Sequence, residues 1–308
     1  MPEFAMVEAL NEALRRQLST DDRVLVLGED IGRLGGVFRV TDRLQEEFGD
    51  DRVFDTPLGE SGIAGMSIGL AMYGYRPVAE IQFDSFVLPA FNQIVAHAAK
   101  YRFRSRGNMP VPMVLRIPFG GEIGAAELHS ESPETYFAHT AGLTVVVPST
   151  PLDAFDLLTM SIQSSDPVIF FEPKSRYWSK QEGELGEDPL PIGRARVVRE
   201  GDACTLISYG AMVARCNEAA MAAEEDGVSV EVVDLRSLVP LDVGTLIQSV
   251  RKTGRAIVVH EAPKTLGFGA EVSARIMEEA FESLQAPVLR VTGYDTPYPP
   301  AKVEKSYV

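Results

Sequence analysis

Short apolar runs that suit buried strands alternate with helical stretches along the whole chain, and this alternation restricts the possible folds most strongly. Parallel strands cannot be joined by tight turns and need long crossover connections, which are usually helices. The pattern therefore predicts an α/β fold built on parallel sheets. The expected strands are residues 24–27, 53–54, 77–82, 113–117, 144–147, 168–171, 204–208, 228–233, 256–259 and 288–291.

Helical periodicity marks the segments between these strands. Residues 85–104 are expected to form one long helix, because the whole stretch keeps a helical pattern and closes with several cations. The expected helices are residues 8–18, 40–48, 60–73, 85–104, 133–139, 151–162, 212–223 and 243–253.

The chain changes character between Glu172 and Pro191, where charged residues, glycines and prolines replace the apolar runs. Such a stretch is typical of a linker that crosses the surface between domains. A chain of 308 residues is long enough for two ordinary cores. We therefore expect two domains of similar architecture, at residues 1–185 and 186–308.

Composition excludes several classes of partner. No apolar run is long enough to span a bilayer, and the first residues lack a basic-then-apolar secretion signal. A net charge of −15 argues against nucleic acid, but it suits a basic protein partner. Cys204 and Cys216 are expected to be reduced thiols in a cytoplasmic protein. Residues 1–4 are expected to be a leader or a cloning remnant without structure.

Motif searches exclude several kinds of chemistry. The Gly28–Gly32 turn is not GxGxxG, so a nicotinamide-binding fingerprint is absent from the sequence. There is no P-loop, HExxH or CxxC spacing, and Gly59–Gly62 places its glycines wrongly for a serine-hydrolase elbow.

The stretch Asp55–Gly62 has the strongest local signal. Pro57 and Gly59 break a short strand, and Gly62, Gly65 and Gly69 then share one side of the following helix. Each glycine costs a helix about 1 kcal/mol relative to alanine, so the face predicts the close approach of another backbone or a flat ligand. Glu60 lies at the start of this helix, where a carboxylate would also be explained by the helix dipole alone.

Three chemically useful side chains follow neighbouring expected strands. Glu60 follows strand 53–54, Phe86 follows strand 77–82, and His129 follows strand 113–117 on a glycine-bearing segment. Ligands of parallel sheets bind beyond the carboxyl ends of the strands, so all three belong to one rim. A carboxylate, an aromatic face and an imidazole together suit an aromatic nitrogen heterocycle. Singly, Phe86 could be a core residue and His129 a structural one.

Several runs of residues together carry a family resemblance. The runs are Val26–Asp30, Asp55–Gly62, Glu80–Phe83, Pro89–Gln93, Leu128–Ser132, Phe170–Lys174, His260–Pro263 and Gly293–Pro297. They resemble the beta subunit of the thiamine-diphosphate-dependent 2-oxo acid dehydrogenases, which are the decarboxylating components of the pyruvate and branched-chain complexes. The resemblance covers nearly the whole chain, and it implies a pyrimidine-binding transketolase-like domain followed by a transketolase C-terminal domain.

The resemblance also implies roles for individual residues. Glu60 would hydrogen-bond N1′ of the cofactor's aminopyrimidine, and Phe86 would stack on that ring. Leu58 and Gln82 would line it. His129 resembles the family histidine that orients the later transfer of the acyl group to a lipoyl group, and can serve as an acid or base near neutral pH.

Partner chains are expected to supply the parts of the family's active site that this sequence lacks. The sequence has no Gly-Asp-Gly followed by an Asn-rich run, so a separate alpha chain should supply the magnesium-diphosphate site. We expect two alpha and two beta chains, and no activity from this chain alone. The acidity fits docking of the acyltransferase core's basic subunit-binding module, although the chain stops at Val308, before a short terminal helix that relatives usually add.

A potassium site held by main-chain oxygens in some family members is a further expectation, and an ordinary strand end and turn is the alternative. The residues that would supply it are Val111, Met113, Val114, Ser161, Ser164 and Asp166.

The substrate is less well indicated than the reaction. The runs Glu80–Phe83, Ser132–Glu134 and Phe171–Lys174 look closer to branched-chain members than to pyruvate ones. Pyruvate and acetoin dehydrogenases are the enzymatic alternatives. The non-enzymatic alternative is a scaffold that binds the acyltransferase core, for which Glu60, Phe86 and His129 would be expendable.

Overall fold

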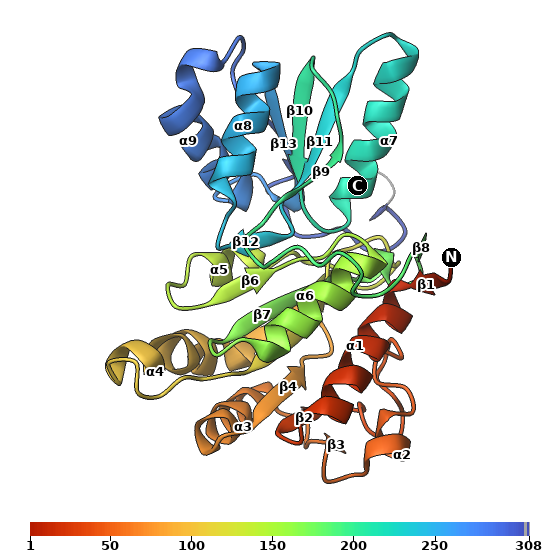
Figure 1. Cartoon of the computed structure of the whole chain (residues 1–308), viewed down its shortest axis with the longest axis vertical. Coiled ribbons are helices and arrows are strands. Elements are labelled where there is room, and N and C mark those ends of the chain that lie inside the picture. The colour runs from red at the N-terminus through yellow and green to blue at the C-terminus, as the bar shows by residue number, and fades with distance from the viewer. Residues whose placement is uncertain (305–306, 308) are drawn as a thin grey trace.

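The computed structural model describes residues 1–304 and 307 and has two α/β domains, one above the other in Figure 1. The first domain is built on a seven-stranded sheet with the order β12-β6-β7-β5-β4-β2-β3, in which all neighbours are parallel except β12 and β6. Its strands are β2 (Val24–Gly28), β3 (Val53–Asp55), β4 (Arg76–Glu80), β5 (Val114–Phe119), β6 (Thr144–Val146), β7 (Val168–Pro173) and β12 (Ser237–Val239).

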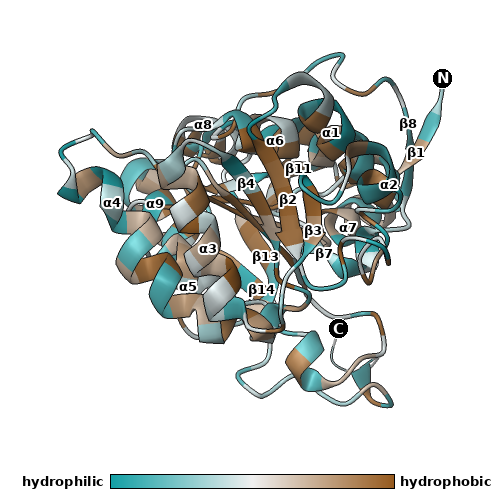
Figure 2. Cartoon of the chain, turned by 90° about the horizontal axis from the view of Figure 1, so that it is seen from below, coloured by the Kyte–Doolittle hydropathy of each residue, from teal (hydrophilic) through white to brown (hydrophobic). Residues whose placement is uncertain are grey.

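Helices cover both faces of this sheet because its strands are apolar on both sides, as the brown central strands of Figure 2 show. Val26 and Val114 point into the core beneath α1 and α6, whereas Leu27 and Leu115 point into the core beneath α3. The helices are α1 (Met6–Thr20), α2 (Leu44–Phe48), α3 (Glu60–Tyr73), α4 (Ala99–Arg104), α5 (Glu134–Ala138) and α6 (Pro151–Gln163).

The stretch predicted as one long helix, residues 85–104, is helical throughout, but it is not one regular α-helix. The segment is instead a 3₁₀ helix, η1 (Asp84–Ala90), a π-helical turn, η2 (Gln93–Ala98), and the short α4. Pro89 lies inside the first piece, and proline removes a backbone donor from the helical ladder. Phe86 lies on the 3₁₀ piece, which begins shortly after the end of β4.

The first residues also differ from expectation. β1 (Glu3–Ala5) pairs antiparallel with β8 (Lys180–Glu182), so this part of the chain is structured. β8 lies within the expected linker, and Glu172 and Lys174 at the start of that stretch are buried. Its first residues therefore belong to the first domain.

The second domain contains a five-stranded sheet with the order β14-β13-β10-β11-β9, and only β9 is antiparallel to its neighbour. The predicted parallel fold is therefore confirmed in both domains. The helix α9 was not expected from the sequence. The elements are β9 (Arg196–Arg199), β10 (Cys204–Ser208), α7 (Met212–Glu225), β11 (Val230–Asp234), α8 (Val243–Thr253), β13 (Ala256–Pro263), α9 (Phe268–Ala280) and β14 (Leu289–Gly293).

The two domains share a continuous contact. Strand β12 leaves the second domain and pairs with β6 at the edge of the first sheet, where Figure 1 places it between them. One apolar core includes Phe119 and Val147 from the first domain and Ile207 and Leu235 from the second. The two sheets are thus held together by packed side chains and by strand pairing.

Glu134 is a titratable group buried at this contact. Tyr209 Oη donates a hydrogen bond of 2.6 Å to Glu134 Oε1, and Glu134 Oε2 has no partner among the described residues. Burial raises the pKa of Glu134 to about 7, although the Tyr209 hydroxyl acts to lower it. The folded state therefore favours the protonated acid.

Replacing Glu134 by glutamine should change how stability depends on pH. The folded-state pKa of about 7 lies above the ordinary value of 4.5, so this group's stabilisation is present below pH 4.5 and lost as the pH rises through 7. We expect the wild type to lose about 3 kcal/mol relative to Glu134→Gln across that range. Urea unfolding at several pH values measures the difference, with the exposed Glu278→Gln as the control. Parallel curves for wild type and Glu134→Gln would contradict the assignment.

Within the described residues, no helix combines the length and the apolar character that crossing a membrane requires.

Candidate active site at the carboxyl rim of the first sheet

The predicted rim exists, and five neighbouring strands contribute to it. In sheet order they are β7, β5, β4, β2 and β3. Lys174 follows β7, the 120–131 loop follows β5, Gln82 follows β4, Glu29 follows β2, and Glu60 follows β3. Parallel strands with a common orientation thus bring these side chains to the same edge.

Glu60 is the first residue of α3 and is partly exposed. The glycine face of the same helix is open, since a Cβ added to Gly62 or Gly69 would meet no atom within 4 Å. At Gly65 the nearest atom would be Gln93 Oε1, at 4.0 Å. No described segment of this chain makes the expected close approach, so the face remains available for another molecule.

Glu29 is a site residue that was not singled out from the sequence. Its side chain is buried, and Glu29 Oε1 accepts a hydrogen bond of 3.2 Å from the main-chain N–H of Gly59. Burial raises the pKa of Glu29, and the charges of nearby Glu60 and Asp30 act in the same direction. Its position directly after a buried strand could have predicted that it lies at the same rim as Glu60.

Gln82, which follows β4, is hydrogen-bonded to the two residues that follow the neighbouring strand β2. Gln82 Nε2 donates to Glu29 O at 3.2 Å and to Asp30 Oδ2 at 3.0 Å. The predicted Gln82 is therefore beside Glu29, and β2 separates its strand, β4, from β3, which Glu60 follows. Leu58, the other expected lining residue, is 85% exposed and contributes only an uncovered apolar side chain.

His129 and Phe86 are together, as the rim argument required. The ring of His129 stacks on Phe83 with centroids 4.0 Å apart and meets the edge of Phe86 at 5.1 Å. His129 Nδ1 is buried and has no hydrogen-bond partner among the described residues. Ser61, next to Glu60, donates to the main-chain oxygen of Pro89 in the segment that carries Phe86, which links the Glu60 and His129 sides of the rim.

A buried ion pair holds the main chain around His129. Lys174 Nζ donates to Asp84 Oδ1 at 2.5 Å and to His129 O at 2.6 Å. Asp84 Oδ2 accepts from Glu131 N at 2.5 Å. Burial raises the pKa of Asp84 and lowers that of Lys174, and in each case the partner's charge opposes the shift. From the sequence, Lys174 was named only as the last residue of one family-like run, and Asp84 was not singled out.

A second buried cluster lies at the strand ends beneath the rim. Arg116 of β5 contacts Glu172 of β7 through Nε at 2.6 Å and Nη2 at 2.8 Å, and Glu80 of β4 through Nη1 at 2.7 Å. Tyr177 Oη donates a further hydrogen bond of 2.6 Å to Glu172. Ion pairs thus connect β4, β5 and β7. These are the strands that Gln82, the 120–131 loop and Lys174 follow.

The expected potassium residues lie elsewhere, around the start of β5 and the end of α6. Several of their main-chain oxygens already accept hydrogen bonds: Val111 O from Met113 N at 2.9 Å, Met113 O from Val168 N at 2.9 Å, and Ser164 O from Arg76 Nη1 at 2.8 Å. A cation would have to share Ser164 O with a guanidinium group.

The rim residues fit a thiamine-type cofactor on their own chemistry. They offer the carboxylate of Glu60, the aromatic faces of Phe83 and Phe86, and an orphaned buried nitrogen on His129. An open helix face adjoins them. This combination suits a flat heterocycle that is covered from outside this chain.

Comparisons with known proteins agree with the architecture. Residues 2–179 match the transketolase pyrimidine binding domain, and residues 193–308 match the transketolase C-terminal domain. A solved structure of a split-gene transketolase, described as an inactive beta4 tetramer, superimposes with a TM-score of 0.81 at 23% identity over 98% of this chain and 93% of its own. The fold and site therefore define a transketolase-like protein of the thiamine-diphosphate-dependent class.

Relatives with higher sequence identity define the family within this class of proteins. The chain is 56% identical to the pyruvate dehydrogenase E1 component subunit beta of Leifsonia xyli, over 98% of this chain and 90% of the relative. It is 53% identical to the 3-methyl-2-oxobutanoate dehydrogenase subunit beta of Mycobacterium tuberculosis, over 99% and 88%. For a pyruvate dehydrogenase E1 subunit beta of Staphylococcus epidermidis the identity is 50%, over 100% and 95%. The chain belongs to the family of E1 beta subunits of the 2-oxo acid dehydrogenases.

The boundary predicted between residues 185 and 186 falls between the two matched regions. Its location within that gap stays a prediction.

Proposed function

We propose that this chain supplies the pyrimidine side of a thiamine-diphosphate site and, together with an alpha chain, decarboxylates a 2-oxo acid and passes the acyl group to a lipoyl group. The observation that carries the proposal is the position of Glu60 at a rim shared with Phe86 and His129, beside a glycine face that nothing in the described chain covers. A site open on one side calls for a second chain.

Glu60 acts by accepting a hydrogen bond in this proposal. When bound, thiamine diphosphate would supply a nucleophilic carbon for chemistry at the substrate's carbonyl group. Glu60 would hold N1′ of its aminopyrimidine ring, Phe86 would pack on the face of that ring, and Leu58 and Gln82 would border it. Closure by a partner would remove water around Glu60 and strengthen this hydrogen bond.

His129 is proposed to act as an acid or base in the later acyl transfer. Its imidazole is oriented by the stack on Phe83, and its main chain is held by Lys174. Nδ1 of the ring is buried and has no hydrogen-bond partner among the described residues, so this nitrogen is not committed to another group of that part of the chain. A residue with these restraints loses little freedom when it transfers a proton.

Two kinds of partner are proposed. An alpha chain would bring the diphosphate and magnesium site and complete a tetramer of two alpha and two beta chains. The glycine face of α3, flanked by the exposed Met66, Met72 and Tyr73, has the composition of a surface that another chain covers. An acyltransferase core with a basic binding module would meet a chain whose net charge is −15.

The substrate stays undecided between pyruvate and branched-chain 2-oxo acids. Relatives named for each acid have similar identity to this chain, at 56% and 53%. The lean toward branched-chain acids that the sequence motifs suggested gains no support from these names. Pyruvate is therefore the second candidate substrate.

Potassium remains a prediction that the contacts do not favour. The main-chain oxygens of Val111, Met113 and Ser164 already accept hydrogen bonds, one of them from a positively charged arginine. The mechanism proposed here needs no potassium ion.

The test is to mix the purified chain with a cognate alpha chain, thiamine diphosphate and magnesium. We expect no release of carbon dioxide from either chain alone and turnover from the mixture, because neither chain holds the whole site. Pyruvate and 3-methyl-2-oxobutanoate are offered in separate assays, and the acid with the larger kcat/KM identifies the substrate class.

Analytical ultracentrifugation of the same mixture provides the control. A stable complex without turnover would favour the scaffold that binds the acyltransferase core. Turnover by the beta chain alone would contradict the proposed division of the site.

A further inference from the structure

The loop that carries His129 contains a turn whose main-chain N–H groups bind carboxylates from the second domain. Gly120, Glu122 and Gly124 have positive φ angles of 82°, 64° and 70°. Residues of left-handed conformation alternating with ordinary ones turn successive N–H groups toward the same side and form an anion-binding hollow.

Two carboxylates fill this hollow. Glu261 Oε1, at the end of β13, accepts from Gly121 N at 2.5 Å. Glu304 Oε1 accepts from Glu122 N at 2.6 Å, and Glu304 Oε2 accepts from Gly124 N at 3.0 Å. Tyr298 Oη also donates to Glu304 Oε1 at 2.9 Å. Glu304 is only 8% exposed, so the contact is not a surface ion pair.

The glycines of the turn are explained by this contact. A Cβ added at Gly120 would lie 2.8 Å from Glu261 Oε2, and one at Gly121 would lie 1.8 Å from Tyr298 Oη. The space next to both residues is therefore occupied by the second domain.

The opposite end of the loop is held by the first domain. Gly120 N donates to Glu131 O at 2.9 Å and closes the loop at its base. Lys174 and Asp84 fix His129 O and Glu131 N. The 120–131 loop thus has one set of restraints from each domain, and His129 lies at the end that the first domain holds.

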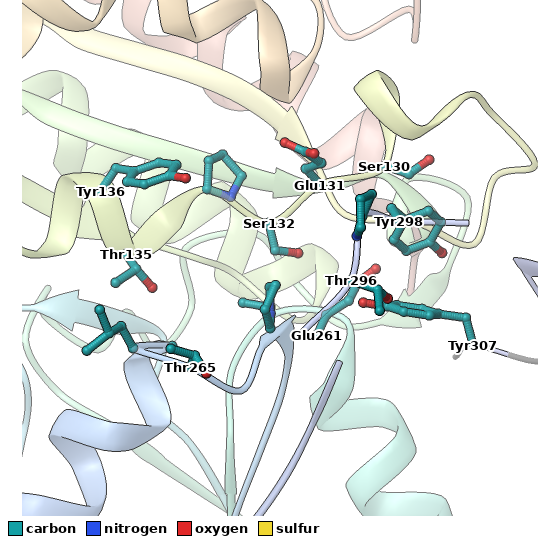
Figure 3. A pocket seen from close by; sticks show the side chains of 16 residues that line it. Ser130, Glu131, Ser132, Thr135, Tyr136, Glu261, Thr265, Thr296, Tyr298 and Tyr307 are labelled. Atoms are coloured by element: carbon teal, nitrogen blue, oxygen red, sulfur yellow. The ribbon is translucent and has the colours of Figure 1, made fainter. Parts of the chain in front are cut away.

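A cavity next to the loop makes the restraint from Glu304 important. A cavity of about 350 Å³ separates Ser130–Ser132 from parts of the second domain, and Figure 3 shows Glu261, Tyr298 and Tyr307 facing it. Side chains of the described residues do not fill this space, so packing among them does not by itself hold the loop on that side.

We propose that Glu304, assisted by Tyr298, is a positioning residue that binds the main-chain N–H groups of Glu122 and Gly124 and thereby holds His129 in place for acyl transfer. The inference rests on the proposed function of His129. Glu304 touches neither substrate nor cofactor in this proposal, and it acts through the loop.

The test uses the assembled enzyme with its alpha chain, thiamine diphosphate and magnesium. Glu304→Ala should lower kcat for acylation of a lipoyl domain by about tenfold, since small misplacements of a reacting group have effects of this size or larger. The KM for thiamine diphosphate should change by less than about twofold, because Glu60 and Phe86 lie outside the loop. Glu304→Gln keeps one acceptor oxygen and should retain most of the activity. The exposed Glu278→Ala is the matched control.

Amide hydrogen exchange gives a readout that does not need activity. In Glu304→Ala, the amides of residues 121–129 should exchange about tenfold faster, while those of β2 and α3 stay unchanged. Unaltered exchange in the loop would overturn the proposal, even if activity fell. An equal loss of kcat, cofactor affinity and thermal stability would also overturn it, because it would indicate only a structural role. If the wild-type mixture had no turnover, the proposed function would fail, but the exchange experiment would still show whether Glu304 holds the loop.

Discussion

Replacing Arg116 by methionine is expected to destabilise the chain by about 3–5 kcal/mol, because the change leaves the buried carboxylates of Glu80 and Glu172 without their cation. Arg116 and Glu172 are fully buried, and Glu80 is 3% exposed, so water cannot compensate for the lost charge. Urea unfolding at neutral pH, followed by circular dichroism, measures the loss. The effect is among the largest that a single substitution produces.

The response to pH distinguishes this mechanism from a simple packing defect. Burial raises the pKa of Glu80 even with Arg116 present, and removing Arg116 should raise it further. A raised folded-state pKa means that the group's stabilisation is lost as the pH rises, so the deficit of the variant should shrink on acidification from neutral pH.

The surface pair of Arg102 and Asp166 provides a matched control. Their side chains are each 45% exposed and 2.7 Å apart. Arg102→Met should cost less than about 1 kcal/mol. Equal losses for Arg102→Met and Arg116→Met would contradict the role given to burial. Restoring stability to Arg116→Met by adding Glu80→Gln and Glu172→Gln would support it.

The strand-helix alternation predicted the fold because buried parallel strands are apolar on both faces. Residues 24–27, 168–171 and 204–208 all lie within observed strands at matching positions. The helix over 151–162 was predicted equally well, and Thr150 caps it by accepting a hydrogen bond from Asp153 N. These signals are local, so one sequence is enough to read them.

The failures come from contacts between distant residues. Residues 85–104 kept a helical period, but Pro89 and packing against α3 divide the segment into three pieces. Residues 3–5 became a strand only because Lys180–Glu182 pairs with them. No local pattern indicates a partner that is so far away in the chain.

In the candidate site, too, some residues could be predicted from local patterns and others depend on distant contacts. Glu60, Phe86 and His129 were placed at one rim by the rule for parallel strands, and the structure confirms that arrangement. Three charged residues lie in otherwise apolar strands: Glu80, Arg116 and Glu172. Their positions could have predicted ion pairs in the core, which the structure contains. Glu304 could not be found, because its partners are main-chain N–H groups about 180 positions away.

Replacing Glu60 by glutamine is expected to lower the turnover of the assembled enzyme by about 10²–10³-fold, the size typical of losing one group that stabilises developing charge. Glutamine keeps the shape of the side chain but removes its negative charge. Glu60 is partly exposed at the first position of α3, so the change should alter stability by less than about 0.5 kcal/mol. Initial rates of carbon dioxide release and the midpoint of unfolding are measured on the same preparation.

Glu46→Gln is the control for this experiment, since Glu46, like Glu60, is a carboxylate in the first turn of a helix, and its side chain is exposed. If Glu60 served only the helix dipole, both variants should retain turnover and lose the same few tenths of a kcal/mol. Unchanged turnover in Glu60→Gln would therefore remove the cofactor role and leave the dipole explanation.

Replacing Glu29 by glutamine distinguishes two explanations for the importance of Glu60. Glu60 could act through its own hydrogen bond to the cofactor, or through negative charge that it shares with Glu29. Glu29 holds the main-chain N–H of Gly59 and faces Glu60, but it lies deeper in the protein. If Glu60 works by accepting a hydrogen bond from the cofactor, Glu29→Gln should reduce turnover far less than Glu60→Gln. The carboxylate of Glu60 remains in place in the Glu29→Gln variant. Equal losses in the two variants would mean that the pair acts as one unit, since groups that act together show the same penalty whichever one is removed. In that case the essential property of the rim would be its shared negative charge, and the role assigned to Glu60 alone would have to be given to both residues.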